Sequence, residues 1–218
     1  VIHAAAALPI QDSEQILRTD LEGTRVVLRR ARDRGVDRFV YISTTAVYGI
    51  PDLHPIPEDF EGTPVGPYGQ AKWRAEQACR SFRDDFFVSI LRPKTFVGEE
   101  RLGIMEVLFD WIRRGKNIYV LGDGTNEYQL LDVHDLCRAI WLAMTHPDAN
   151  DTFNVGATDY GTINEDMQPV LDEADTGARL VHLPAPPIQT VLRLLEWLNL
   201  SPIVRWQYDT MDKDSSVE

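Results

Sequence analysis

The first 155 residues alternate between short apolar runs and longer stretches with helical periodicity. Residues 38–43 form an apolar, β-prone run bounded by polar positions, which is typical of a strand buried on both faces. Residues 13–34 carry apolar side chains at helical spacing, and Gly35 supplies a helix stop. This βαβα order predicts an α/β fold with a parallel sheet.

The remaining elements follow the same rhythm as far as residue 155. Residues 50–67 are rich in Pro and Gly and predict a loop. The Asp-Gly pair within residues 122–124 predicts a hairpin turn between two short strands, and Asp132 is expected to cap the helix that follows it. Further helices are predicted over residues 67–83, 103–114 and 133–145, and further strands over residues 1–7, 86–91, 117–121, 128–131 and 152–155. From residue 160 onward the pattern is irregular, and Pro184, Pro186 and Pro187 precede an amphipathic helix.

Composition and charge narrow the classes of partner. The net charge of -12 argues against nucleic acid, because a phosphate backbone is bound through clustered Lys and Arg. No apolar run approaches the ~20 residues needed to cross a bilayer, and we see no signal peptide at the start. Cys79 and Cys137 are too few for a disulfide framework and lack metal-ligand spacing. We therefore expect reduced thiols, no metal site and a cytoplasmic protein.

Tyr68 and Lys72 are the first candidates for chemistry. They lie four residues apart in a predicted helix, so both side chains project from the same face. A phenol ionises near pH 10, but an ammonium about 4 Å away would favour the phenolate by roughly three pK units, as general acid–base catalysis requires. Only four of the 22 basic residues are lysines, so a Lys at this position is noticeable. The alternative is that Tyr68 and Lys72 are an ordinary tyrosine and lysine on a surface helix.

Three hydroxyl side chains follow the buried strand that precedes this helix, those of Ser43, Thr44 and Thr45. In open α/β sheets, ligands bind just beyond the carboxyl ends of the strands. A hydroxyl there can hold a substrate oxygen while Tyr68 exchanges its proton. The alternative is that Ser43 and Thr44 only satisfy backbone groups at the strand end.

These segments resemble a known family. The sequence FVYISTTAVYG at residues 39–49, followed by PYGQAK at residues 67–72, resembles the extended short-chain dehydrogenase/reductases. This is the NAD-dependent epimerase/dehydratase group, which includes UDP-galactose 4-epimerase. Further landmarks follow in the family's order: VIHAA at 1–5, GT at 23–24, LRP at 91–93 with Gly98, GDG at 122–124, VHD at 133–135 and FNVG at 153–156. The remainder of the chain matches loosely, as the family's variable substrate lobe does.

The resemblance implies a fold, a domain division and a cofactor. The fold would be an α/β, Rossmann-like parallel sheet whose N-terminal part is missing, with a smaller C-terminal substrate-binding lobe. The nucleotide-binding domain would comprise residues 1–98 and 132–156, and the substrate-binding lobe residues 99–131 and 157–218. The cofactor would be NAD or NADP, with NAD favoured, and a homodimer through the long helices would follow the family.

The resemblance also implies roles for individual residues. Chemistry would begin by hydride transfer between a substrate carbinol carbon and the nicotinamide. Tyr68 would be the acid/base, Lys72 would lower its pKa and bind the nicotinamide ribose, and Thr44 would orient the reacting hydroxyl. The implied cofactor-binding residues are His3, Ala4, Ala5, Ala6, Ser43, Tyr68, Lys72 and Pro93. The implied substrate-binding residues are Thr44, Thr45, Lys94, Thr95 and Tyr128.

Three features depart from the family's pattern. The Gly-rich fingerprint that holds the pyrophosphate is absent, and in the family it lies upstream of the strand on which this sequence opens. We therefore expect a fragment, an incomplete sequence or a chain completed by a partner. Tyr128 stands where nucleotide-sugar enzymes usually carry an Arg that grips the diphosphate of the substrate. Asp20 stands where the family often has an Asn, and it lacks the amide donor.

The function predicted from the sequence is that of an NAD(P)-dependent epimerase/dehydratase-type enzyme with a small-molecule substrate, and a nucleotide sugar is the leading choice. Tyr128 leaves room for an NAD(P)-dependent dehydrogenase or reductase of a non-sugar carbinol, such as a sterol. A third alternative is a non-catalytic, cofactor-binding scaffold of the same fold. Neither nucleic acid nor a membrane is expected as a partner.

Overall fold

A computed structural model describes four stretches of the chain, residues 1–7, 11–99, 104–198 and 210–218. The chain divides into two compact units, each with its own hydrophobic core. The first unit consists of Val1–Phe96, Leu131–Gly156 and Val217–Glu218. The second unit consists of Val97–Leu130 and Ala157–Ser216.

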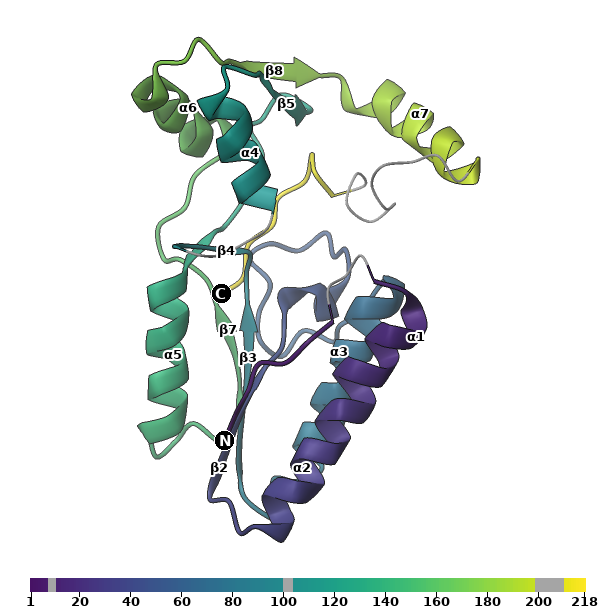
Figure 1. Cartoon of the computed structure of the whole chain (residues 1–218), viewed down its shortest axis with the longest axis vertical. Helices are drawn as coiled ribbons and strands as arrows, with labels where there is room; N and C mark the ends of the chain where they lie inside the picture. Colours follow the sequence, from purple (N-terminus) through teal and green to yellow (C-terminus); the bar gives the residue numbers. More distant parts are fainter. Residues whose placement is uncertain (8–10, 100–103, 199–209) are drawn as a thin grey trace. The chain divides into compact units, whose positions relative to one another are not determined.

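The first unit is built on a four-stranded parallel sheet with the strand order β1-β2-β3-β7 (Figure 1). Its strands are β1 (Ile2–His3), β2 (Arg38–Ile42), β3 (Phe87–Pro93) and β7 (Thr152–Val155). Every neighbouring pair is parallel, which confirms the sheet predicted from the βα alternation. The carboxyl ends of all four strands therefore lie at one edge of the sheet.

Helices cover both faces of this sheet (Figure 1). One face carries α3 (Gly66–Arg80) and a continuous helical run made of α1 (Ser13–Ile16), the π-helical turn η1 (Leu17–Gly23) and α2 (Thr24–Asp33). The opposite face carries α5 (Val133–Thr145). The sequence predicted this long helix but not its π-helical turn. The largest core lies beneath α2 and α3 and contains Leu28, Phe39, Tyr41, Cys79, Val88 and Ile90.

Local signals in the sequence explain where these helices begin. The carboxylate of Asp132 accepts a hydrogen bond from the backbone N–H of His134 at 2.6 Å, which confirms the predicted cap of α5. Pro67 lies in the first turn of α3, where the missing N–H of proline costs nothing. Asp12 caps α1 by accepting a bond from the backbone N–H of Gln15 at 2.9 Å.

The second unit has a two-stranded parallel sheet of β5 (Ile118–Leu121) and β8 (Leu180–Leu183). Helices α4 (Ile104–Arg113) and α6 (Ile163–Ala174) pack on it through a core that includes Ile112, Val120 and Leu171. Helix α7 (Ala185–Trp197) follows β8. Two further short strands, β4 (Phe96–Val97) and β6 (Leu131–Asp132), pair with each other.

Several predictions for the second unit are wrong. The predicted hairpin does not form, because β5 pairs instead with β8, about sixty residues downstream. Of the predicted strand at residues 128–131, only Leu131 lies in a strand, where it begins β6. The sequence pattern did not reveal α6 or β8. A capping box between Thr162 and Glu165 begins α6, and this signal was present in the sequence. Pro186 and Pro187 lie inside the first turn of α7 rather than before it, where proline is tolerated.

Candidate active site

The carboxyl edge of the four-stranded sheet collects most of the residues that the sequence singled out. Strand β1 leads into four alanines, β2 leads into Ser43, and β3 ends at Pro93. Because these strands are parallel neighbours, the three ends lie at the same edge. Tyr68 and Lys72 come from α3, the helix that packs on this sheet. Tyr128 lies in the second unit.

At the end of β1, the histidine turns inward and the alanines face outward. The His3 ring is buried against Tyr41, with the ring centroids 5.7 Å apart. Its Nε2 lies 2.9 Å from the hydroxyl of Thr24. Burial, followed by the charge of Lys72, lowers the pKa of His3, so the imidazole is neutral at pH 7. The alanines at residues 4–6 are exposed, and their small side chains leave the backbone accessible.

At the end of β2, two adjacent hydroxyls face different surroundings. Ser43 is buried and donates its hydroxyl proton to Glu76 at 2.5 Å. Thr44 is half-buried and caps the short 3-10 helix η2 (Thr45–Tyr48), where its hydroxyl oxygen accepts from the backbone N–H of Ala46 at 3.2 Å. Accepting this bond leaves the O–H of Thr44 able to donate to another group. Thr44 thus combines the capping role with a hydroxyl at the sheet edge.

Helix α3 lies close against this strand end. A Cβ atom on Gly69 would stand 2.8 Å from the carbonyl oxygen of Ala46, which is closer than side-chain atoms approach a backbone oxygen. Glycine is therefore required for the close packing of α3 on η2. This packing places Tyr68, the neighbour of Gly69, next to the segment that carries Thr44.

The buried side chain of Lys72 links α3 to the sheet. Its side chain is 2% exposed, and Nζ donates to the carbonyl oxygen of Ile42 at 2.7 Å. The same Nζ lies 4.6 Å from the ring centroid of Tyr41, a cation–π contact. Burial lowers the pKa of Lys72 to about 8, although neighbouring negative groups oppose the change. The ammonium is therefore charged at neutral pH and loses its charge in mildly alkaline solution.

Tyr68 lies one helical turn before Lys72 and is only half-buried. Its ring packs against Ala7, Ile16 and Ala71, so the segment after β1, the start of the long helix and α3 meet at this tyrosine. The pair therefore combines a phenol near the surface with a buried ammonium on the same helix.

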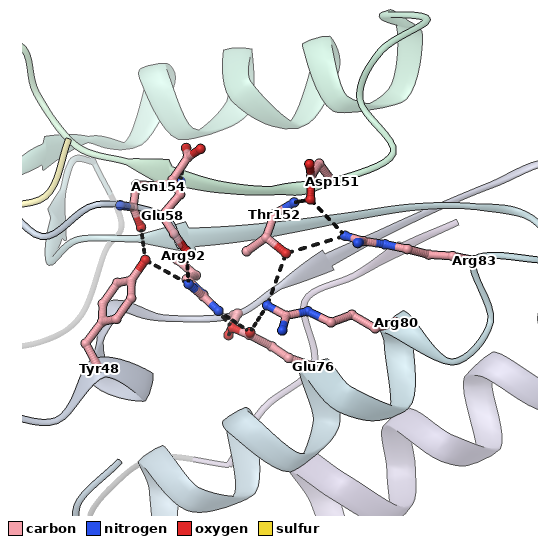
Figure 2. Close-up of polar contacts among 10 residues, drawn as sticks. Tyr48, Glu58, Glu76, Arg80, Arg83, Arg92, Asp151, Thr152 and Asn154 are labelled. Atoms are coloured by element: carbon pink, nitrogen blue, oxygen red, sulfur yellow. Dashed lines mark hydrogen bonds and ion pairs between the residues drawn. The ribbon is translucent and has the colours of Figure 1, made fainter. Parts of the chain in front are cut away.

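A buried ion pair lies one turn beyond Lys72 on the same helix (Figure 2). The carboxylate of Glu76 is fully buried and accepts two bonds from Arg92 of β3, from Nε at 3.0 Å and from Nη2 at 2.7 Å. Arg80 adds a weaker bond to Glu76 at 3.3 Å. Because Glu76 also accepts from Ser43, this one carboxylate ties α3 to the carboxyl ends of β2 and β3.

The network continues from Arg92 to β7 and to the loop after η2 (Figure 2). Nη1 of Arg92 donates to the hydroxyl of Tyr48 at 2.8 Å and to the carbonyl oxygen of Glu58 at 3.1 Å. Tyr48 in turn donates to the side-chain oxygen of Asn154 at 2.7 Å. All of the bonds to Arg92 lie within the first unit, and they fix three strand ends relative to one another.

At the end of β3, a second lysine is buried. Lys94 is 5% exposed, and its backbone N–H donates to the carbonyl oxygen of Val155 at 2.9 Å. Burial lowers the pKa of its ammonium to about 8. The next residue, Thr95, is half-buried, and its carbonyl oxygen accepts from the backbone N–H of Leu131 at 3.0 Å. A costly buried charge of this kind is common at ligand sites.

Tyr128 is half-buried in the second unit. Its backbone N–H donates to the carbonyl oxygen of Gly161 at 3.2 Å, and it forms an isolated parallel bridge with Ser215. These contacts belong to loops rather than to the strand that the sequence predicted.

Sequence reasoning did not assign a role to Glu76 or Arg92. A signal was present, because Glu76 follows Lys72 by one helical turn and therefore shares its face. In the part of the chain that the structure describes, no helix is long and apolar enough to span a membrane. Within the same residues, no group of three or more His, Cys, Asp and Glu is placed to hold a metal ion.

Comparison with known proteins assigns the chain to a family. Residues 1–156 match the NAD dependent epimerase/dehydratase family. The chain belongs to this family. The match confirms the resemblance inferred from the motifs. It covers the four strands of the first unit, together with Tyr68, Lys72 and Thr44.

Individual relatives match most of this chain. The uncharacterized protein y4nG of Sinorhizobium fredii is 35% identical over 206 residues, covering 93% of this chain and 52% of that protein. UDP-arabinose 4-epimerase 1 of Arabidopsis thaliana is 30% identical over 215 residues, covering 84% of this chain and 51% of that protein. The chain thus spans about half the length of the curated relatives that it matches.

A solved structure supports the same fold. The dTDP-glucose 4,6-dehydratase DesIV of Streptomyces venezuelae, crystallised as a double mutant with NAD bound, is 25% identical to this chain. Its TM-score is 0.70, and the similarity covers 83% of this chain and 60% of that chain. This similarity and the parallel sheet confirm the predicted Rossmann-like α/β fold.

Proposed function

We propose that this chain carries the acid–base centre of an NAD(P)-dependent epimerase/dehydratase-type enzyme that acts on a nucleotide sugar. The observation that carries the proposal is the placement of Tyr68 and Lys72. A buried ammonium lies one helical turn from a half-buried phenol, on a helix packed against the strand end that bears Thr44. Relatives that include a 4-epimerase and a 4,6-dehydratase support the same reaction class.

In the proposed mechanism, Tyr68 exchanges a proton with the reacting hydroxyl of the substrate. The neighbouring ammonium of Lys72 favours the phenolate form, which accepts that proton. Thr44 orients the same substrate oxygen through its O–H, which remains able to donate. A bound nicotinamide dinucleotide supplies the hydride acceptor for the carbinol carbon. A non-catalytic scaffold protein would have no use for a buried lysine that lowers the stability of the fold.

The strand ends fit the nicotinamide part of such a cofactor. The backbone at residues 4–6 is accessible to a flat ligand, because the alanine side chains are small and exposed. Lys72 has N–H donors beyond the one that Ile42 accepts, and these suit ribose hydroxyls. The Ser43 hydroxyl is used by Glu76, so Ser43, like Pro93, would contribute through its backbone. The sequence contains no Gly-rich turn for the pyrophosphate, so these residues account for the nicotinamide end alone.

The substrate part of the proposal rests on Lys94, Thr45 and Thr95, which adjoin the ends of β2 and β3. A buried ammonium attracts an anion such as a diphosphate more strongly than an exposed one does, because water screens it less. The second unit would form the substrate-binding lobe, with the first unit as the nucleotide-binding domain. Tyr128 would contribute a phenol from that lobe.

Tyr128 also favours a second candidate function. A neutral phenol is a poor substitute for the guanidinium fork that holds phosphate bidentately. A dehydrogenase or reductase of a non-sugar carbinol needs no such fork. Screening the chain with UDP-sugars, dTDP-sugars and secondary alcohols without phosphate separates the two functions, since the second predicts turnover only in the last group.

The experiment that tests the proposal compares the chain with Tyr68→Phe. Binding of NADH is first followed by energy transfer from tryptophan to the nicotinamide. Turnover is then measured on the UDP- and dTDP-sugar panel with added NAD. We expect Tyr68→Phe to lower kcat by about 10²–10⁴-fold, the usual contribution of a general acid–base group, with the same melting temperature. Tyr119→Phe, which alters an exposed tyrosine of β5, is the matched control and should leave kcat unchanged.

The two measurements test different parts of the proposal. A folded sample that shows no saturable transfer from NADH would mean that this chain does not bind the cofactor by itself. A Tyr68→Phe variant with the kcat of the original chain would remove Tyr68 from the chemistry and leave the scaffold alternative.

A further inference from the structure

Asp20 occupies an unusual place in the first unit. It lies in the π-helical turn η1, and its side chain is fully buried. Oδ1 accepts from the backbone N–H of Ala7 at 2.9 Å, whereas Oδ2 has no hydrogen-bond partner among the described residues. A buried carboxylate oxygen without a partner costs stability, so its presence calls for a reason. π-Helical turns of this kind are frequent at functional sites.

The surrounding bonds hold Asp20 in one orientation. The hydroxyl of Thr24 donates to the carbonyl oxygen of Asp20 at 2.6 Å, and Nε2 of His3 lies 2.9 Å from that hydroxyl. Because Thr24 has given its only proton to Asp20, His3 must be the donor in the second contact. The backbone of Asp20 is thus held by β1 and α2, and its side chain is held by the segment after β1.

Helix α3, which carries Lys72, packs against the π-helical turn η1, which carries Asp20, and the Lys72 ammonium is the cation that acts electrostatically on the Asp20 carboxylate. From β1 and β2, His3 and Tyr41 are neutral, because burial lowers the pKa of the imidazole and raises that of the phenol. On α3, burial likewise raises the pKa of the Cys79 thiol and keeps it neutral. The charge of Glu76 is already matched by Arg92 and Arg80. Asp20 is therefore the negative charge near Lys72 that no guanidinium in the described network neutralises.

We propose that Asp20 is the counter-ion of Lys72 and holds its ammonium charged inside the protein, which makes Asp20 a positioning residue for the acid–base pair. The inference rests on the proposed function of Tyr68 and Lys72. Lys72 donates to the carbonyl oxygen of Ile42, a neutral acceptor that does not supply the negative charge a buried ammonium needs. An amide at position 20 would keep the bond to Ala7 but remove the charge.

The direction of the effect follows from the pKa of Lys72. Burial lowers this pKa to about 8, and the charge of Asp20 acts against burial by raising it. Removing that charge must lower the pKa further, so Lys72 would lose its proton near neutrality. Activity that requires the ammonium is lost as the pH rises through this pKa. The alkaline limb of the pH profile should therefore move to lower pH when Asp20 is neutralised.

The test uses Asp20→Asn, which has the same shape and retains an oxygen for the N–H of Ala7. The chain has only four lysines, so their side-chain NMR signals can be followed one by one during a pH titration. Lys72→Met assigns the signal of Lys72. We expect Asp20→Asn to lower the midpoint of the Lys72 titration by about one pH unit, the shift that corresponds to a loss of about 1.4 kcal/mol of attraction to the charged form. The Lys94 signal is the internal control and should not move.

The pH profile of kcat is measured on the same samples, with Asp110→Asn as a control on the surface of α4. The alkaline limb should shift with the Lys72 midpoint in Asp20→Asn and stay in place in Asp110→Asn. An unchanged Lys72 midpoint overturns the counter-ion assignment and leaves the proposed function intact. If the Lys72 midpoint falls but the limb of kcat stays, the counter-ion assignment holds and the proposed role of Lys72 fails.

A reciprocal measurement guards against loss of folding in Asp20→Asn. Burial raises the pKa of the Asp20 carboxyl, and the charge of Lys72 acts against burial by lowering it. Lys72→Met removes this opposing charge. The ¹³C titration of Asp20 should therefore move to higher pH than in the unmodified chain. An Asp20 titration that does not move, or that moves to lower pH, overturns the assignment without use of the Asp20→Asn variant.

Discussion

The buried ion pair between Glu76 and Arg92 allows a sharp test of how the site is held together. We consider Arg92→Met, which retains an unbranched chain of similar length but removes the guanidinium. Arg92 is 1% exposed and Glu76 is fully buried, so solvent screens neither charge. The substitution removes both bonds to Glu76, together with those to the hydroxyl of Tyr48 and the carbonyl oxygen of Glu58.

The expected cost follows from this geometry. Removing one partner of a buried ion pair costs about 3–5 kcal/mol, because the remaining charge is left without compensation. Glu76 retains its bonds to Ser43 and Arg80. The bond to Arg80 is long at 3.3 Å, and the Arg80 side chain is 31% exposed. We therefore expect Arg92→Met to lower the free energy of unfolding by about 3 kcal/mol.

Urea denaturation followed by tryptophan fluorescence measures this loss. Arg113→Met is the matched control, because Arg113 pairs with Asp110 at 2.8 Å but is 75% exposed. Surface ion pairs contribute about 0–1 kcal/mol, so Arg113→Met should lower the free energy of unfolding by less than about 1 kcal/mol. In the double variant Glu76→Gln, Arg92→Met, no unpaired carboxylate remains, and we expect it to be more stable than Arg92→Met alone.

The reasoning would be refuted by either of two outcomes. A loss below about 1 kcal/mol in Arg92→Met, equal to the loss in Arg113→Met, would show that the buried pair contributes no more than an exposed one. A double variant no more stable than Arg92→Met would show that the cost does not come from the uncompensated charge of Glu76.

Two further predictions concern stability. Burial lowers the pKa of Lys94 from 10.5 to about 8, so the folded state disfavours the charged form. Lys94→Met should therefore raise the free energy of unfolding at pH 7 by about 3 kcal/mol while weakening substrate binding. This gain should shrink between pH 8 and 10.5 in a series of urea titrations, and a constant gain would contradict the assignment. Gly49 has a φ of 77°, and a Cβ there would collide with the carbonyl oxygen of Thr63. Gly49→Ala should therefore cost about 2–4 kcal/mol in thermal or urea unfolding, and a cost below 1 kcal/mol would contradict this backbone conformation.

Local features of the sequence were sufficient to predict most of the first unit. The strands at residues 38–42 and 152–155, and the long helix from Ser13, follow from periodicity within the segment itself. The cap at Asp132 involves an N–H two residues away, so it is equally local. The spacing of Tyr68 and Lys72 places them on one helix face whatever the helix packs against.

The second unit shows where local patterns are insufficient. The segment at residues 128–131 has strand-like composition, but only Leu131 lies in a strand, β6, because the partner of β5 comes from about sixty residues downstream. Strand propensity depends on which neighbour is available, and a single segment contains no information about that neighbour. The π-helical turn around Asp20 was missed for a related reason, since packing rather than propensity accounts for such a turn.

The candidate site likewise combines features that the sequence determines with features that only the tertiary structure determines. The sequence by itself determined which residue types stand at the strand ends and on α3, because these depend on position along one chain segment. Only the tertiary structure decided that Ser43 faces Glu76, that Glu76 meets Arg92, and that Asp20 is buried. Burial and charge pairing depend on which elements come together in space. The same carboxylate is solvated on a surface helix, whereas inside the sheet–helix core it sets the protonation of its neighbours.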